Sequence, residues 1–134
     1  MDSKRVAAVV RDVFAQDPGD VAAVYLYGSV ARGTARASSD VDLGVLFATD
    51  PPQTLEGLAL DTAAELEDRL GRPVQLVVLN RAPAELVHYV LRDGQLLLDR
   101  NPSVRIAFEM RKRDEYWDLL PFLRLYRRME EAPL

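Results

Sequence analysis

The chain has no cysteine and a single histidine, His88, among its 134 residues. Without cysteine it can form neither a disulfide nor a thiolate metal site, and one imidazole cannot build a histidine cluster. We therefore expect any metal ion bound by this chain to be held by oxygen ligands.

Long apolar runs are absent as well. No stretch approaches the roughly 18 consecutive apolar residues of a membrane span, and residues 1–5 lead into an amphipathic pattern rather than a signal peptide. The sequence therefore predicts a cytoplasmic protein with no membrane contact. The formal net charge is -4 and the isoelectric point is near 5.0, so no direct nucleic-acid partner is expected.

What the chain does have is enough apolar material for a core, since 49% of its residues are hydrophobic. Its length suits a single domain spanning residues 1–134. Apolar residues at helical spacing alternate with short apolar runs, so we expect an α/β (α+β) fold with a small mixed sheet of about four strands packed by helices. The expected helices cover residues 3–15, 29–34, 54–70, 80–93 and a long C-terminal segment from 101, and the expected strands cover 21–27, 41–47, 72–79 and 95–99.

Two short motifs stand between the first two expected strands. Gly28-Ser29 follows the first strand, and ten residues later Asp40-x-Asp42 opens the second. Residues two apart on a strand share a face, so the two carboxylates should lie together and repel unless a cation sits between them. Mg²⁺ takes one or two protein carboxylates and completes its shell with water and phosphate oxygens. Glycine and a hydroxyl allow close approach to an anion, so the pattern predicts a phosphate site beside a metal site.

Each motif alone has an ordinary structural explanation. Gly-Ser is a common turn pair, and Asp-x-Asp at the start of a strand is often a solvated edge or a helix cap. The joint arrangement of strand, Gly-Ser, ten residues, Asp-x-Asp and strand is more specific. It resembles the signature of the nucleotidyltransferase superfamily typified by DNA polymerase beta, and the match at Gly28, Ser29, Asp40 and Asp42 is complete. The resemblance implies the nucleotidyltransferase fold.

The resemblance also implies roles for these residues. Gly28 and Ser29 would hold the terminal phosphates of ATP, and Asp40 and Asp42 would be the catalytic carboxylates that bind Mg²⁺. Arg32 is close enough in sequence to contact phosphate, and a position on the surface is an equal alternative.

The third strand differs from the pattern of the superfamily. Members commonly carry a third carboxylate there, facing the Asp-x-Asp pair, and this chain reads Val74-Gln75-Leu76-Val77. If Gln75 occupies that catalytic position, the site keeps an oxygen acceptor and loses a charge and a base. The alternative is that the register is different and Gln75 only bonds a neighbour.

Other segments resemble the minimal nucleotidyltransferases, most of all the antitoxins of HEPN/minimal nucleotidyltransferase toxin-antitoxin systems. These segments are residues 77–83, 90–94 and 115–118, so the resemblance covers most of the chain. It implies a Mg²⁺-dependent enzyme that transfers AMP from ATP to a tyrosine hydroxyl of a HEPN-type ribonuclease toxin. A weakened enzyme that neutralises its toxin by binding is the alternative. The aminoglycoside nucleotidyltransferases share the loop but usually carry a second, helical domain. Nucleotidyl transfer to a small molecule of this type is therefore a less favoured alternative.

The C-terminal helix is expected to serve as a partner surface, because it combines aromatic and basic residues beyond what a small core can bury. Tyr116, Trp117, Phe122 and Tyr126 are examples, and Pro121 must kink or break the helix among them.

Overall fold

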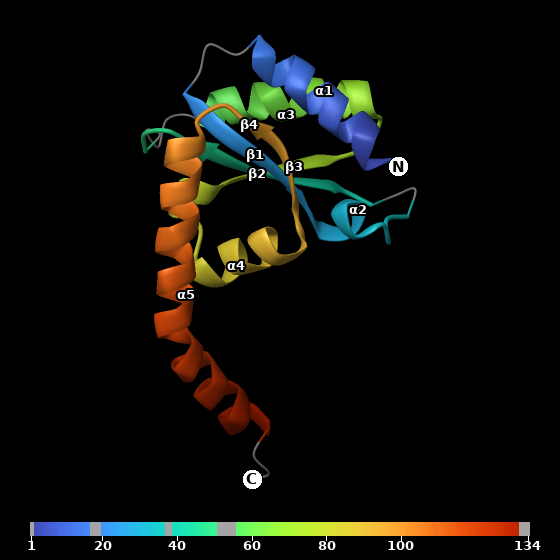
Figure 1. Cartoon of the computed structure of the whole chain (residues 1–134). Helices are drawn as coiled ribbons and strands as arrows, with labels where there is room; N and C mark the ends of the chain where they lie inside the picture. The colour runs from blue at the N-terminus through green and yellow to red at the C-terminus, as the bar shows by residue number, and fades with distance from the viewer. Residues whose placement is uncertain (1, 17–19, 37–38, 51–55, 132–134) are drawn as a thin grey trace.

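The strands form a sheet that separates two helical layers (Figure 1). The computed structural model describes residues 2–16, 20–36, 39–50 and 56–131, and of residues 56–60 only the backbone. The elements in chain order are α1 (Ser3–Ala15), β1 (Val21–Tyr27), α2 (Gly28–Arg32), β2 (Val41–Phe47), α3 (Glu56–Leu70), β3 (Val74–Val78), the 3-10 helix η2 (Leu79–Arg81), α4 (Ala84–Asp93), β4 (Gln95–Asp99) and α5 (Pro102–Glu131). The expected α/β (α+β) order of helices and strands is confirmed.

The sheet is mixed, as expected. Within the described residues its four strands lie in the order β3-β2-β1-β4. β1 runs antiparallel to both β2 and β4, whereas β2 and β3 run parallel. A parallel pair needs a crossover, and α3 supplies it between β2 and β3.

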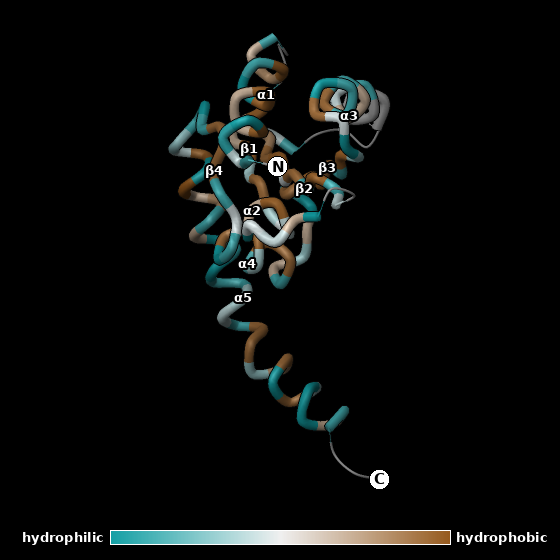
Figure 2. Tube along the Cα trace, turned by 90° about the vertical axis from the view of Figure 1, so that its right-hand side faces the viewer, coloured by the Kyte–Doolittle hydropathy of each residue, from teal (hydrophilic) through white to brown (hydrophobic). Residues whose placement is uncertain are grey.

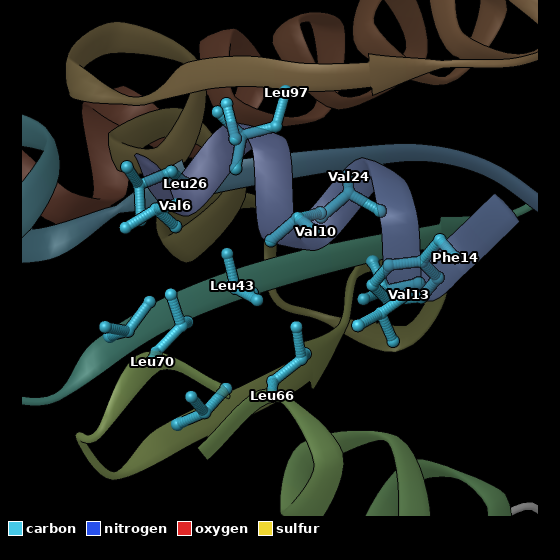
Figure 3. Packing of buried hydrophobic residues seen from close by; sticks show 14 of the residues in the cluster. Val6, Val10, Val13, Phe14, Val24, Leu26, Leu43, Leu66, Leu70 and Leu97 are labelled. Atoms are coloured by element: carbon cyan, nitrogen blue, oxygen red, sulfur yellow. The ribbon is translucent and has the colours of Figure 1, made fainter. Parts of the chain in front are cut away.

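One face of the sheet is covered by α1 and α3. Apolar residues at helical spacing on α1 pack on alternate residues of β1 and β2, and Figure 3 shows Val10 and Phe14 directed at this face. Leu66 and Leu70 of α3 complete the cluster. Leu43 of β2 belongs to this cluster, so its neighbour Asp42 points to the opposite face of the sheet.

The other face is covered by α4 and the first half of α5. Val87 and Val90 of α4 and Phe108 of α5 pack against Tyr25 of β1 and Leu46 of β2. Since side chains two apart on a strand share a face, Asp42 lies on the same side of the sheet as Leu46. The functional motif and the α4–α5 layer therefore share one side of the molecule.

The ends of some helices differ from expectation. The helix expected from Asn80 begins at Ala84, because η2 and Pro83 come between it and β3. Asn80 instead bonds β2, accepting from the Phe47 N–H and donating to the Phe47 carbonyl, each at 2.9 Å. The short helix begins at Gly28 and ends at Arg32. The helix cap expected at Thr54 lies outside the described residues.

α5 is continuous from Pro102 to Glu131, so Pro121 does not break it, and the helix changes direction in its C-terminal half (Figure 1). Asn101 caps its start by accepting the Val104 N–H at 3.3 Å. Across the described part of the chain, no helix combines the length and the apolar character needed to cross a membrane. Figure 2 shows that the C-terminal half of α5 projects away from the body and carries alternating apolar and polar residues.

Candidate functional site

The site is built where β1 ends and the chain turns into α2. Gly28 opens α2 with a φ of +77°, in the left-handed region that favours glycine. A Cβ placed on Gly28 would lie 3.2 Å from Cγ of Asp42 and closer still to its Oδ2. Only a glycine backbone therefore fits against this carboxylate, and the contact brings the Gly-Ser turn and the Asp-x-Asp motif together.

The register of the sheet aligns three polar residues. Asp42 on β2 pairs with Tyr27 on β1 and with Gln75 on β3. All three lie on the α4–α5 face, since Tyr27 packs against that layer, as does Val77, two residues beyond Gln75. Gln75 is exposed and Asp42 is half-buried. Gln75 is thus the residue of β3 directly beside Asp42. The sequence left this position open, because it depends on the strand register.

Charge at the site is mainly negative. Burial raises the pKa of the Asp42 carboxyl above its usual value, the nearby Asp40 carboxylate raises it further, and Arg32 lowers it. Burial also raises the pKa of the Tyr27 hydroxyl, with Asp42 contributing in the same direction. Burial and the Asp40 carboxylate both penalise the negative charge of Asp42, so a bound cation would relieve the repulsion between Asp40 and Asp42.

The donors present suit Mg²⁺ better than a softer metal. Asp40 is exposed just ahead of β2, Asp42 is half-buried, and Gln75 adds a neutral amide oxygen. Among the residues that the structure describes, no three His, Cys, Asp or Glu side chains gather into a metal cluster. Two carboxylates match the way Mg²⁺ is usually held, with the remaining positions left to water and substrate phosphates.

The other two expected residues lie on α2. Ser29 is half-buried, its carbonyl accepts the Thr34 N–H at 3.0 Å, and its hydroxyl makes no hydrogen bond with any described residue. Arg32 is exposed at the end of α2. Its guanidinium lowers the pKa of Asp42 as a lesser cause and also acts on Asp93 of α4. The Ser29 hydroxyl and the Arg32 guanidinium are therefore available beside the carboxylates.

Two neighbours of the site were missed in the sequence. Tyr27 directly precedes the Gly-Ser pair, but its alignment with Asp42 follows from strand pairing. The C-terminal end of α4 also approaches α2, since Gln95, just beyond it, donates to the Ala31 carbonyl at 3.1 Å. Nothing in the local sequence around Asp93 signals this approach.

Comparison with known proteins decides the family. The family model described as polymerase beta, nucleotidyltransferase, matches residues 10–103, which include the whole Gly-Ser and Asp-x-Asp region. The chain belongs to this family. Within it, the chain is 36% identical over 75 residues to protein adenylyltransferase MntA of Shewanella oneidensis. That match covers 55% of this chain and 51% of MntA, so it spans about half the length of the relative.

Solved structures share the fold over nearly the whole chain. One is the crystal structure of a toxin-antitoxin with AMP-PNP, with a TM-score of 0.79 at 22% identity, covering 94% of this chain and 98% of that one. Another is a tri-AMPylated Shewanella oneidensis HEPN toxin in complex with MNT antitoxin, with a TM-score of 0.74 at 19% identity, covering 96% of this chain and 98% of that one. At these identities the likeness establishes the nucleotidyltransferase fold.

Proposed function

We propose that this chain is a Mg²⁺-dependent nucleotidyltransferase that transfers AMP from ATP to a tyrosine hydroxyl of a HEPN-type ribonuclease toxin and so acts as its antitoxin. Its family and its likeness to a protein adenylyltransferase support the reaction. The fold it shares with chains from toxin-antitoxin structures, one with AMP-PNP and one with an AMPylated HEPN toxin, supports the acceptor and the role.

The observation that carries the proposal is the contact between Gly28 and Asp42. It puts a backbone that can approach phosphate against a carboxylate that can approach a metal ion. In our proposal Gly28 and Ser29 hold the terminal phosphates of ATP, and Arg32 adds positive charge at the same end of α2. Asp40 and Asp42 hold Mg²⁺, which when bound offsets the negative charge of the triphosphate.

The residues then position an in-line transfer. The acceptor oxygen forms a bond to the α-phosphorus of ATP, the bond to the bridging oxygen breaks, and pyrophosphate leaves. Gln75 cannot take the acceptor proton, because an amide is not a base at neutral pH. A phenol, with an ordinary pKa near 10, gives up its proton to water more readily than an alkyl alcohol does. A tyrosine acceptor therefore suits a site with an amide at this position.

Gln75 also supports a second candidate function. With one carboxylate fewer than the superfamily pattern, the chain would be a weakened enzyme that neutralises its toxin by binding. Loss of a general base typically costs about 10²- to 10⁴-fold in rate. Both candidates require the same partner, and they differ in whether AMP is transferred.

We propose that the partner contacts the exposed apolar face of α5. Phe122, Leu125, Tyr126 and Met129 are each more than half exposed, and they lie on the half of α5 that leaves the body (Figure 2). Aromatic side chains of this kind are common anchors of protein interfaces.

The test is a transfer assay with the product of the adjacent gene. The chain and that product are incubated with Mg²⁺ and ATP labelled on the α-phosphate, and label on the product is measured with and without EDTA. Asp42→Asn should abolish transfer, and Asp68→Asn, an exposed residue of α3, should leave it unchanged. A complex that forms without any label would favour the binding function, and label that persists in Asp42→Asn would remove the proposed site.

A further inference from the structure

A cavity lies between α4 and α5, outside the Gly-Ser and Asp-x-Asp site. It has a volume of about 150 Å³ and is lined by His88, Leu91 and Arg92 of α4 and by Lys112 and Arg113 of α5. This is about the volume that five water molecules occupy in the liquid, so the cavity admits a group of several non-hydrogen atoms. Its described lining contains three cationic side chains and no carboxylate.

Several N–H groups of this cavity have no partner among the described residues. Arg92 uses Nε and Nη2 on the two carboxylate oxygens of Asp93, at 3.1 and 2.8 Å, which leaves three of its five N–H groups. Lys112 donates to the Ala82 carbonyl and to Glu115, each at 3.1 Å, which leaves one. Arg113 is exposed and makes no hydrogen bond or ion pair with any described residue. The cavity therefore offers an anion the remaining donors of Arg92 and Lys112, which their own hydrogen bonds hold in place, together with the Arg113 guanidinium.

One aromatic ring, that of His88, lines the cavity, and it packs against two rings outside the lining. The His88 ring stacks on Tyr116 of α5 with centroids 3.8 Å apart and planes 3° from parallel. Tyr89 meets His88 edge-on at 5.5 Å, and the Arg92 guanidinium lies 4.9 Å from the centre of the Tyr89 ring. Guanidinium groups can bind a phosphate, and the His88 ring beside them offers contact to the sugar or base that a nucleotide adds to its phosphate.

The cavity is close to the proposed ATP site. Arg92, one turn of α4 beyond His88, bonds Asp93, and this hydrogen bond is the main reason that the pKa of Asp93 lies below its usual range. Arg32 of α2 lowers the pKa of Asp93 too, so the end of α2 is near the end of α4 that carries Arg92 and Asp93. Both sites are on the α4–α5 side of the sheet.

We propose that the cavity between α4 and α5 is a second subsite, which binds the 5′-phosphate of a nucleotide separately from Mg²⁺-ATP. The phosphate has two sources. One is AMP already attached to the acceptor protein, a source that rests on the proposed function, and the other is a free nucleoside monophosphate. In the first case the subsite would hold the modified acceptor for a further transfer, in which a ribose hydroxyl oxygen bonds the α-phosphorus of a second ATP, pyrophosphate leaves and the hydroxyl proton goes to water.

The direct test is an NMR titration of the ¹⁵N-labelled chain with 5′-AMP in EDTA, so that the Mg²⁺-dependent site takes no part. We expect shifts for residues 88–92 and 112–116, and much weaker ones with adenosine, which lacks the phosphate. Arg113→Glu should raise the dissociation constant for 5′-AMP at least tenfold. Lys4→Glu makes the same charge change on α1, and it should have no effect.

Mass spectrometry of the modified acceptor separates the two sources. If attached AMP is the source, Arg113→Glu keeps the first transfer and loses later ones, whereas Lys4→Glu matches the wild type. If free nucleotide is the source, the titration responds to Arg113→Glu and the distribution of AMP groups does not change. Equal 5′-AMP affinity in Arg113→Glu and wild type would overturn the subsite. A wild type that transfers no AMP but binds 5′-AMP at these residues would overturn the proposed function and leave the subsite standing.

Discussion

Gly28 and Asp42 depend on each other. Glycine is needed at residue 28 for its φ of +77° and also for the space that the Asp42 carboxylate takes. Gly71, between α3 and β3, has a similar φ of +69°, but a Cβ added there would meet no described atom within 4 Å. Substitutions at Gly71 and Gly28 can therefore be compared to distinguish the effect of backbone strain, which both share, from the effect of contact with the Asp42 carboxylate, which only Gly28 has.

We expect Gly71→Ala to lower the free energy of unfolding by about 1 to 2 kcal/mol, the cost of a left-handed non-glycine residue, with no change in AMP transfer. Gly28→Ala should have the same strain and also displace the carboxylate of Asp42. A displacement of about 1 Å at a reacting centre costs about 10²-fold in rate, so transfer should fall by that factor or more. Urea unfolding and the labelled-ATP assay measure the two effects. Equal transfer by both variants would show that the close contact is not needed.

Substitution of Gln75 tests whether its side chain acts in the proposed site. Gln75→Asp would add a metal ligand and a base beside Asp42, and we expect about 10- to 10³-fold faster AMP transfer, within the usual range for general-base effects. Because Gln75 is exposed and pairs with Asp42, the new carboxylate should lower stability without Mg²⁺ by repulsion and regain it when Mg²⁺ is added.

The matched control for this position is Gln75→Asn, which shortens the side chain equally and adds no charge. It should give no rate gain. A Gln75→Asp variant that unfolds more easily in both metal conditions and transfers no faster would show that the side chain does not act in the site.

At the scale of elements, α5 has two halves with different surroundings. The first half is tied to the sheet, because Phe108 is buried and the Tyr25 hydroxyl donates to Glu109 at 2.9 Å. Arg105 adds ion pairs to Glu109 at 3.1 Å and to Asp99 of β4 at 3.0 Å. The second half exposes its apolar residues, so it can be altered without opening the core.

We expect Phe122→Ser with Tyr126→Ser to weaken the complex with the HEPN-type partner by about 10²-fold, since interface anchors commonly contribute about 2 kcal/mol or more. The free energy of unfolding of the chain alone should change by less than about 0.5 kcal/mol, because both side chains are more than 60% exposed. Isothermal titration calorimetry and urea unfolding give the two numbers.

The control is Arg124→Ser with Arg128→Ser, two exposed residues on the same half of α5. Because residues two apart on a helix point to nearly opposite sides, this pair leaves the apolar face intact, and the affinity should stay within a few-fold of the wild type. An unchanged affinity in the Phe122 and Tyr126 variant would place the partner elsewhere on the molecule.

At the scale of the whole molecule, the charge and the ligand occupancy of the site affect the free energy of unfolding of the protein. Burial and the neighbouring carboxylate both penalise the charged form of Asp42, so the site without a cation lowers the stability of the protein. Ligands that bind only the folded state restore it in proportion to the logarithm of their concentration.

Mg²⁺-ATP at 100 times its dissociation constant should therefore raise the free energy of unfolding by about 2.7 kcal/mol, whereas ATP with EDTA should raise it much less. Asp42→Asn should lose the Mg²⁺-dependent gain, yet be no less stable than the wild type without ligand, since it removes a penalised charge. Urea unfolding monitored by circular dichroism measures each case. Equal stabilisation by ATP with and without Mg²⁺ would contradict the assignment of Asp40 and Asp42 as metal ligands.

The sequence by itself determined the features that depend on local chemistry. Short apolar runs determined the strands β1 and β2, and helical spacing determined α1. The Gly-Ser turn and the Asp-x-Asp pair lie within 15 consecutive residues, from Gly28 to Asp42, so their spacing and the alternation of a strand were enough to predict that the motifs meet. The polymerase beta resemblance rested on the same residues.

The tertiary structure decided what depends on segments that are distant in sequence. Whether Gln75 lies beside Asp42 depends on the parallel register of β2 and β3, and a shift by one residue would have turned it to the other face. The apolar stripe of α5 reads alike along its length, and only packing shows that Phe108 is buried and Phe122 is exposed. The cavity between α4 and α5 likewise joins residues near 90 and 112, because helix packing, which has no local signature, brings them together.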